Sequence, residues 1–377
     1  MIELLPSLLL GTLTVLIGGP YAKTYLLASG MFGVDQQKEN KPWIPTSGGI
    51  LVLFGFIISI TSFLGISSAL SLKVNSAEVL AALSSVTIVA LIGLLDDIHV
   101  NIDLIVQEEL DLEIDEYEID FMQNFEGQLP HQKASRVFRT IAGSRSQGTE
   151  MIREGLGQKP KMLFVLPAVF PLVAVGAGST SMKFPVFGTV EWGLAYPLFL
   201  LPVGLLFVAN VVNMLAGTNG LSASVSAVAA AALGTRALMG GKIEAALIAF
   251  SLATTLAGFL YYNLYPASIL PGDSMTYLSG GALFSAIVLG NMEKFGVFIF
   301  TPWIVEFFLK ARSGFRARSW GILQSDGTLE PQHDRTYSLT HPLMRRGLNE
   351  TQITQAITGL ELLFCAAGLS LASIGLL

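Results

Sequence analysis

The chain has 377 residues, of which 52% are hydrophobic and only 13% are charged, with a formal net charge of −6. A soluble domain of this length carries charge at roughly a quarter of its positions, so the composition excludes a water-soluble globular protein and predicts that lipid is its main solvent. The single cysteine, Cys365, excludes an intrachain disulfide and a cysteine-cluster metal site.

Ten apolar stretches follow one another along the chain, and most approach the roughly 20 residues that a helix needs to cross the hydrocarbon core. Their long, non-alternating runs argue against a membrane β-barrel. The sequence therefore predicts an all-α polytopic membrane protein with ten transmembrane helices. The expected spans are residues 3–19, 46–66, 78–95, 162–178, 194–212, 219–236, 243–261, 275–290, 294–309 and 354–376.

Lysines and arginines are distributed unevenly between the two sets of loops that these spans create. The loops after the first, third, fifth, seventh and ninth spans hold most of them. The opposite loops hold only Lys73, Lys183, Arg236, Lys242 and Lys294. Because loops rich in positive charge stay in the cytoplasm, the first set is predicted to be cytoplasmic and both termini to lie outside.

We expect one transmembrane domain over residues 1–377, with a small cytoplasmic insertion at residues 102–155 between the third and fourth spans. Apolar and acidic residues alternate with period two over residues 110–121. This pattern favours a short solvated strand or hairpin inside the insertion.

The first polar motif on the predicted cytoplasmic side is Gly33-Val-Asp-Gln-Gln-Lys38, which precedes the second span. Lys38 offers a point charge for a phosphate group. It also fits an ordinary loop lysine that anchors the membrane orientation, and the motif alone does not decide between the two.

Asp96 and Asp97 end the third span. A carboxylate at the bilayer centre costs roughly 2.5–3.5 kcal/mol, so this pair is predicted to lie at the interface or in a wet cleft. Paired acids there suit Mg²⁺, a cation-bridged pyrophosphate or proton abstraction. Two solvated helix-end acids are the alternative, although acids at a helix C-terminus oppose the macrodipole.

Amide side chains gather at the end of the fifth span. Asn210 and Asn213 are three residues apart and share a helix face, while Asn219 and Gly220 predict a tight turn. Such amides could ligate Mg²⁺ or contact a nucleobase. Capping and turn formation explain Asn219 and Gly220 equally well, but they do not explain Asn213.

Asp273 follows Pro271-Gly272 just before the eighth span. It could cap that helix or direct a carboxylate at a cation.

The last cytoplasmic loop, residues 310–346, is basic, and its arginines suit bidentate phosphate contacts. His341 in this loop is either a substrate contact or a polar loop residue. The candidates for phosphate contact are Arg312, Arg316 and Arg318.

These acids, amides and basic residues meet at one membrane interface, and the chain has no Walker-type phosphate loop and no metal-spaced histidine cluster. The combination favours Mg²⁺-assisted phosphoryl transfer from a water-soluble polyanionic donor to a lipid acceptor.

The chain resembles the polyprenyl-phosphate N-acetylhexosamine-1-phosphate transferase family over nearly its whole length. The amide-rich segment after the fifth span is similar to the archaeal and eukaryotic dolichyl-phosphate branch rather than to the bacterial phospho-N-acetylmuramoyl-pentapeptide transferases. The resemblance is carried by residues 33–38, 95–97, 210–221, 271–273 and 338–340.

The resemblance implies a role for each matching residue. Asp273 and Asn213 would ligate Mg²⁺, or Mn²⁺ in its place, and Asp96 and Asp97 would lie beside the acceptor phosphate. Lys161, with Lys159 as the alternative, is similar to the family's phosphate-binding lysine, although about 60 residues separate it from the aspartate pair here. The residues implied to contact substrate are Lys38, Lys161, Asn210, Asn219, Gly220, Arg316, Arg318 and His341, with Asn219 at the uracil and Arg316 or Arg318 near the pyrophosphate.

The implied activity is transfer of GlcNAc-1-phosphate from UDP-GlcNAc to a polyprenyl or dolichyl phosphate, a first step of lipid-linked glycan assembly such as that of protein N-glycosylation. The expected partners are these two substrates and the bilayer, with no nucleic acid, and a homodimer is left open. The expected location is an archaeal-type cell membrane, or the endoplasmic reticulum if the source is eukaryotic, with a cytoplasmic active site.

Three alternatives stay open at this point. Another UDP-N-acetylhexosamine would use the same phosphate chemistry. A secondary transporter would fit the ten spans, although transporters place their charged groups near the bilayer midplane. A non-catalytic membrane scaffold could use the acidic insertion as a docking site.

Overall fold

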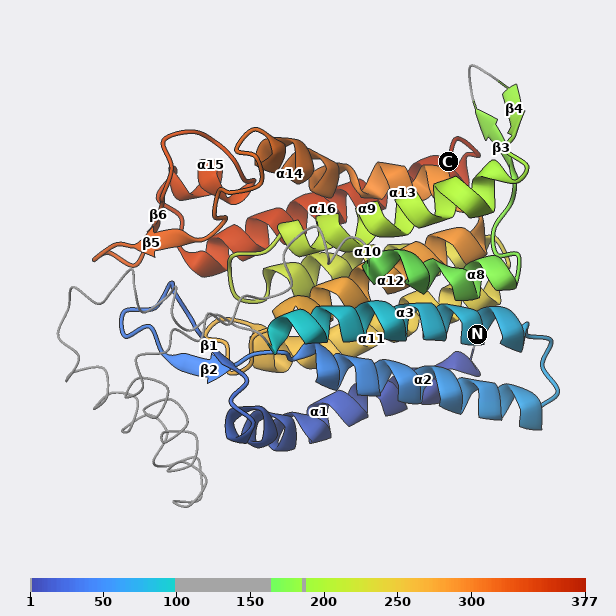
Figure 1. Cartoon of the computed structure of the whole chain (residues 1–377), viewed down its shortest axis with the longest axis horizontal. Coiled ribbons are helices and arrows are strands. Elements are labelled where there is room, and N and C mark those ends of the chain that lie inside the picture. Colours follow the sequence, from blue (N-terminus) through green and yellow to red (C-terminus); the bar gives the residue numbers. More distant parts are fainter. Residues whose placement is uncertain (1, 99–163, 185–187) are drawn as a thin grey trace.

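The computed structural model describes residues 2–98, 164–184 and 188–377, and it forms a bundle of long helices (Figure 1). Within these described residues, seven helical segments are long and apolar enough to cross a membrane. They coincide with seven of the expected spans, which supports a polytopic membrane protein. They are α1 (Leu4–Ala28), α2 (Gly49–Ala69), α3 (Ser76–Asp97), the π-helical turn η2 (Tyr196–Leu200) continuing into α9 (Leu201–Met214), α10 (Leu221–Met239), α11 (Ile243–Asn263) and α16 (Glu350–Ser373).

The other three expected spans have a different form. The stretch 162–178 contains the short 3₁₀ helix η1 (Leu166–Val169) and α8 (Phe170–Ala174), each with a proline in its first turn. The stretch 294–309 is divided into α13 (Glu293–Ile299) and α14 (Thr301–Ala311). The stretch 275–290 lies in α12 (Gly272–Gly290), a helix of 19 residues that is buried from Ser274 onwards.

The prediction of an all-α chain misses three two-stranded antiparallel hairpins that the described residues form. They join β1 (Phe32–Val34) to β2 (Trp43–Pro45), β3 (Ser181–Phe184) to β4 (Gly188–Glu191), and β5 (Gly321–Leu323) to β6 (Leu329–Pro331). Each strand has only three or four residues, which is too short for period-two alternation to stand out in the sequence. The insertion at 102–155, its expected hairpin and Lys161 lie outside the described residues.

Helix α12 forms the centre of the bundle, where it contacts α2, α3, α9, α10 and α11. Its small residues suit this position, because glycine and alanine allow neighbouring backbones to approach closely. One such close approach is to α3, where a Cβ on Gly93 would overlap the backbone carbonyl of Asp273. This contact fixes the last turn of α3 against the first turn of α12.

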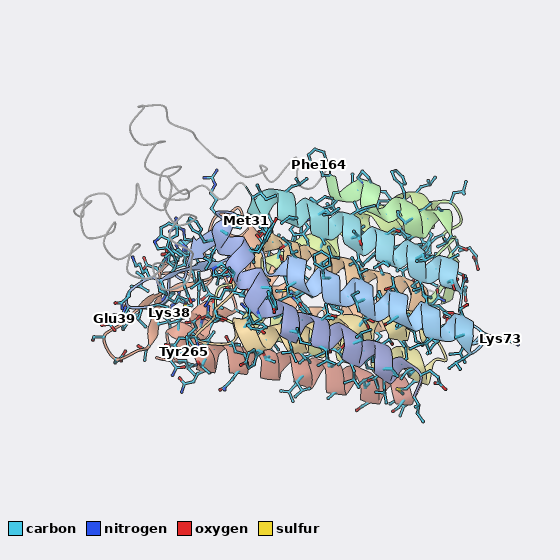
Figure 2. The ribbon with its side chains drawn as sticks, turned by 90° about the horizontal axis from the view of Figure 1, so that it is seen from below. Met31, Lys38, Glu39, Lys73, Phe164 and Tyr265 are labelled. Carbon is cyan, nitrogen blue, oxygen red and sulfur yellow. The ribbon has the colours of Figure 1, made fainter. Side chains whose placement is uncertain are left out.

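The two ends of the bundle differ in content. The β1–β2 and β5–β6 hairpins and the short helix α15 (Thr340–Met344) lie at one end, whereas both termini and the β3–β4 hairpin lie at the other (Figure 1). Figure 2 shows Lys38 and Tyr265 at the first end and Lys73 at the opposite end. The residues expected to carry chemistry are therefore to be sought at the β1–β2 end.

Candidate active site

Asp97, the last residue of α3, binds the first turn of α12. Its Oδ1 accepts a hydrogen bond from the backbone N–H of Asp273 at 2.6 Å, and its Oδ2 accepts one from the N–H of Ser274 at 3.0 Å. The N-terminus of a helix carries unpaired N–H groups and a partial positive charge, so a carboxylate there is stabilising. Asp97 therefore acts as a cap supplied by a neighbouring helix.

Gly272 makes this capping contact possible. Its φ of +68° is costly for any residue with a side chain, and a Cβ at this position would overlap the Asp97 carboxylate. Asp273 does not cap its own helix, because the capping acceptors belong to Asp97. The Asp273 side chain is left to face another helix.

That other helix is α9. The side-chain amide of Asn213 donates from Nδ2 to Asp273 Oδ2 at 3.3 Å, and its Oδ1 accepts a hydrogen bond from the Thr276 hydroxyl at 2.9 Å. One turn earlier on α9, Asn210 Oδ1 accepts a hydrogen bond from the Tyr277 hydroxyl at 3.0 Å. Both asparagines therefore tie the end of α9 to the start of α12.

The structure thus brings together three of the four residues expected to be catalytic, Asp97, Asn213 and Asp273, from three different helices. Asp96 precedes Asp97 at the same helix end and is partly exposed. The cluster is at one end of the long helices, where α3 and α9 end and α12 begins.

A second group of contacts surrounds the turn between α9 and α10, which spans residues 217–220. Gly217 and Gly220 adopt φ values of +125° and +77°, which explains the glycines at these positions. Asn219 is buried, and its Oδ1 accepts a hydrogen bond from the backbone N–H of Ala267 at 3.1 Å. The backbone N–H of Asn219 donates to Glu350 Oε1 at 2.6 Å.

Lys38 is held within this second group. Its ammonium forms ion pairs with Asp35 at 3.2 Å and with Glu350, and it lies 4.4 Å from the centroid of the Tyr265 ring. The side chain is only 12% exposed. Lys38 is therefore already paired with two carboxylates in the absence of substrate.

The basic loop lies over the same end of the bundle. Arg316 and Arg318 are exposed, and the guanidinium of Arg318 stacks over the Trp320 ring at 5.1 Å. His341 is buried beneath the loop, with Nε2 at 2.9 Å from the carbonyl oxygen of Arg318. Burial lowers the pKa of His341 below its ordinary value, although contacts with the carbonyls of Arg318 and Arg335 oppose that shift.

Three residues that hold the candidate site in place were not predicted from the sequence. Thr276 and Tyr277 hold the two asparagines of α9, and Glu350 holds the turn that carries Asn219. The only sequence signal for Glu350 is the pattern Asn349…Gln352, which predicts that a helix starts there. The sequence did not reveal that the Glu350 carboxylate points across to another helix.

Comparison with known proteins agrees with the resemblance of the motifs. Residues 153–291 match the family model described as glycosyl transferase family 4. The chain is 30% identical over 367 residues to a protein of Sulfolobus acidocaldarius that is provisionally named a UDP-N-acetylglucosamine–dolichyl-phosphate N-acetylglucosaminephosphotransferase, with 97% of this chain and 94% of the relative covered.

Two further relatives extend the comparison. A Saccharolobus solfataricus protein with the same printed name is 29% identical over 339 residues, covering 89% of this chain and 86% of the relative. The phospho-N-acetylmuramoyl-pentapeptide-transferase of Moorella thermoacetica is 28% identical over 393 residues, covering 99% of this chain and all of the relative. The chain therefore belongs to the polyprenyl-phosphate N-acetylhexosamine-1-phosphate transferases of glycosyl transferase family 4.

Proposed function

We propose that this protein transfers GlcNAc-1-phosphate from UDP-GlcNAc to a polyprenyl phosphate of the dolichyl type, releasing UMP and leaving polyprenyl-diphospho-GlcNAc in the membrane. The observation that carries the proposal is the convergence of Asp97, Asn213 and Asp273 at one end of a membrane bundle. The archaeal relatives that match almost the whole chain have this activity in their printed names.

The reaction is a direct displacement at phosphorus. An oxygen of the lipid phosphate forms a bond to the β-phosphorus of the donor, and the bond from that phosphorus to the oxygen bridging it to the α-phosphate breaks. The electron pair leaves with UMP. A phosphate monoester has a second pKa of about 6, so the acceptor is already an anion at neutral pH and needs no strong base. The protein residues therefore contribute mainly position and charge.

Asp273 and Asn213 have the donor atoms for a divalent cation, namely one carboxylate and one amide oxygen. In the structure the Asn213 nitrogen faces Asp273 and its oxygen faces Thr276. The Thr276 hydroxyl also lies 3.1 Å from the carbonyl oxygen of Asp273, to which it can donate. If the side-chain amide of Asn213 flips, the Thr276 hydroxyl can therefore accept a hydrogen bond from the amide nitrogen. The amide oxygen of Asn213 then faces Asp273.

No group of three or more histidine, cysteine, aspartate or glutamate side chains suited to a metal ion occurs among the described residues. Mg²⁺ needs no such group, since it commonly binds through one or two carboxylates together with substrate phosphates and water. Bound between Asp273 and Asn213, Mg²⁺ or Mn²⁺ would supply positive charge to stabilise the departing phosphate of UMP.

The remaining residues divide into an acceptor side and a donor side. Asp97 positions the first turn of α12, and hence Asp273, through its two backbone hydrogen bonds. Asp96 is assigned to positioning the acceptor phosphate beside it. On the donor side, Asn219 and the backbone at Gly220 are assigned to the uracil. Two exposed arginines of the basic loop, Arg316 and Arg318, are assigned to the pyrophosphate of the donor.

The proposal includes ten membrane crossings and a site at the cytoplasmic face of an archaeal-type cell membrane. Both termini lie at the end away from the site (Figure 1), which requires an even number of crossings. Besides the seven apolar helices, the η1–α8, α12 and α13–α14 segments are available to make three more. The concentration of lysine and arginine in the loops on the site's side supports the cytoplasmic assignment.

The direct test is to incubate the purified protein with Mg²⁺, a panel of UDP-sugars and polyprenyl phosphates, and to identify the lipid product by mass. We expect a product with UDP-GlcNAc and one UMP released per lipid modified. Asp273→Ala should abolish turnover, whereas Asp334→Ala, which removes an exposed carboxylate from the basic loop, should not. Near-normal UMP release by Asp273→Ala would contradict the assignment of the site.

A further inference from the structure

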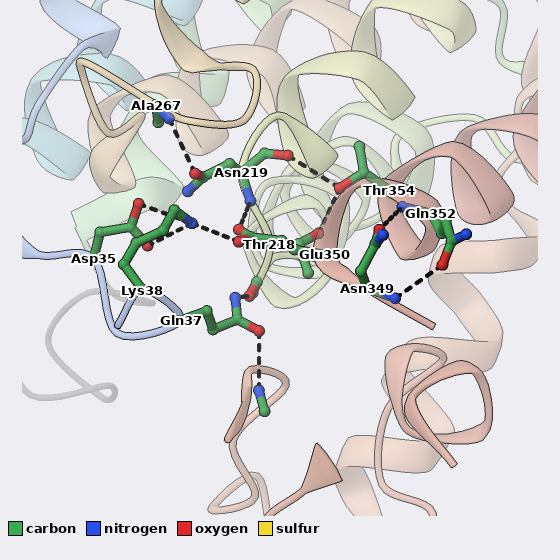
Figure 3. A network of polar contacts seen from close by, with 12 residues as sticks. Asp35, Gln37, Lys38, Thr218, Asn219, Ala267, Asn349, Glu350, Gln352 and Thr354 are labelled. Atoms are coloured by element: carbon green, nitrogen blue, oxygen red, sulfur yellow. Dashed lines mark hydrogen bonds and ion pairs between the residues drawn. The ribbon is translucent and has the colours of Figure 1, made fainter. Parts of the chain in front are cut away.

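The turn at residues 217–220 is held by hydrogen bonds to three other segments of the chain (Figure 3). The carbonyl of Gly217 accepts a hydrogen bond from the Gln37 side chain. Thr354 on α16 bonds both the Thr218 hydroxyl at 2.8 Å and the carbonyl of Asn219 at 3.0 Å. With Ala267 on the Asn219 side chain and Glu350 on its N–H, the turn is fixed before any ligand binds.

Glu350 is the charged member of this set. It lies in the first turn of α16, is 3% exposed, and uses one carboxylate oxygen for the N–H of Asn219 and the other for the ammonium of Lys38. Figure 3 shows its side chain between the 217–220 turn and the loop that carries Lys38. It therefore connects segments that are more than a hundred residues apart in the sequence.

The start of α16 does not need Glu350. Asn349 and Gln352 already form a complete capping box, in which each side chain bonds the backbone N–H of the other residue. A buried carboxylate is costly unless it is paired and hydrogen-bonded. Its presence at this position therefore points to a role outside the helix that contains it.

The charges around Glu350 are balanced by more than one group. Asp35, Lys38 and Glu350 together hold two negative charges and one positive charge. Glu350 also lies at the start of α16 and binds the N–H of Asn219, two residues before α10 begins. The positive ends of both helix dipoles therefore stabilise it. Loss of Lys38 would leave two buried carboxylates without a cation.

We propose that Glu350 is a positioning residue that fixes the 217–220 turn in the conformation in which Asn219 meets the nucleotide of the donor. In this arrangement Lys38 acts by neutralising Glu350 and does not contact a phosphate. The inference rests on the proposed function, because it takes Asn219 to be part of the donor site. Glu350 and Lys38 should therefore both affect the affinity for the donor rather than the rate of the chemical step.

The test uses the full-length protein and four variants: Glu350→Ala, Glu350→Gln, Lys38→Met and the double variant Glu350→Gln with Lys38→Met. Glu350→Ala removes the acceptor of the Asn219 N–H. It should raise the KM for UDP-GlcNAc and the Kd for UDP about tenfold, the change expected when one hydrogen bond to a charged group is lost. The kcat should change far less, because the reacting groups are elsewhere.

The double variant separates the two possible roles of Lys38. Lys38→Met alone leaves the carboxylates of Glu350 and Asp35 buried without a cation, so donor affinity should fall about tenfold or more. In the double variant the glutamine introduced by Glu350→Gln is neutral and still accepts the N–H of Asn219, so affinity should return toward the wild-type value. If Lys38 instead contacts a donor phosphate, the double variant will bind UDP as weakly as Lys38→Met, and the inference is wrong.

Glu361→Gln is the matched control, since Glu361 is another buried carboxylate of α16 that takes no part in this network. It should leave the KM for UDP-GlcNAc unchanged. Wild-type UDP affinity in Glu350→Ala, with an unchanged elution profile, would also overturn the inference. The wild-type protein reports on the proposed function separately. If it binds no UDP and releases no UMP, the proposed function fails and the inference fails with it.

Discussion

Replacing Asp97 with asparagine tests whether this residue acts as a cap or as a chemical group. The carboxylate accepts the N–H groups of Asp273 and Ser274. Asparagine keeps one acceptor oxygen, but it places an NH₂ group against the second N–H, so two donors face each other. The first turn of α12 then has to move away or leave a buried N–H without a partner.

The expected loss of stability follows from those two bonds. A hydrogen bond to a charged group contributes about 1.5–3 kcal/mol, and an unsatisfied buried donor costs about 1–3 kcal/mol. Relief of the repulsion between Asp97 and Asp273 offsets part of this, which leaves a destabilisation of about 3 kcal/mol. From the average unfolding entropy per residue, that lowers the Tm of a chain of this length by about 4 °C.

Activity should fall together with stability. A misplacement of about 1 Å costs on the order of 100-fold in rate, and Asp273 moves with the turn that Asp97 caps. The assay pairs thermal unfolding in detergent with UMP release, and Asp334→Asn serves as the control that removes an exposed carboxylate. A variant with the wild-type Tm and a 100-fold loss of kcat would refute the capping role and indicate that Asp97 acts on substrate directly.

Three further outcomes are expected. Gly93→Ala places a methyl group against the Asp273 carbonyl and should cost about 1–3 kcal/mol of stability and reduce turnover; unchanged melting would contradict this close approach. Chelation with EDTA should stop UMP release and Mg²⁺ should restore it, whereas Asn213→Ala should need a higher Mg²⁺ concentration for half-maximal rate. Burial lowers the pKa of His341, so the unfolded chain binds its proton more readily. The contribution of His341 to the free energy of unfolding should therefore be fully present above about pH 6.5 and be lost as the pH drops below it. His341→Asn should remove that part of the acid sensitivity. Melting curves recorded over a series of pH values would measure it.

Much of the membrane architecture can be predicted from the sequence, because the signal is local. A helix that crosses lipid needs a run of about 20 apolar residues, and the described part of the chain contains seven such helices where they were expected. The broken segments were harder to predict, since apolar composition continues through the boundary between α13 and α14. In α12 the apolar signal is diluted by small and polar residues, which are tolerated because protein surrounds them.

The identity of the residues that converge at the site was also predictable in part. Asp97, Asn213 and Asp273 each stand at a helix end, and helix ends on one side of a membrane share one interface. Their particular contacts were not predictable. Asp97 lies 176 residues from Asp273 in the chain, and no local pattern states that a carboxylate at the end of one helix caps the start of another.

By itself, the sequence determined that this protein crosses a membrane and gathers acids, amides and basic residues on one side of it, because hydropathy and charge act over short stretches. Only the tertiary structure decided what those residues bind. Lys38 pairs with Glu350, 312 residues further along the chain, and the carboxylate of Asp97 caps the first turn of α12. A hydrogen bond or ion pair depends on which groups lie within about 3 Å, and packing of the whole bundle sets that proximity.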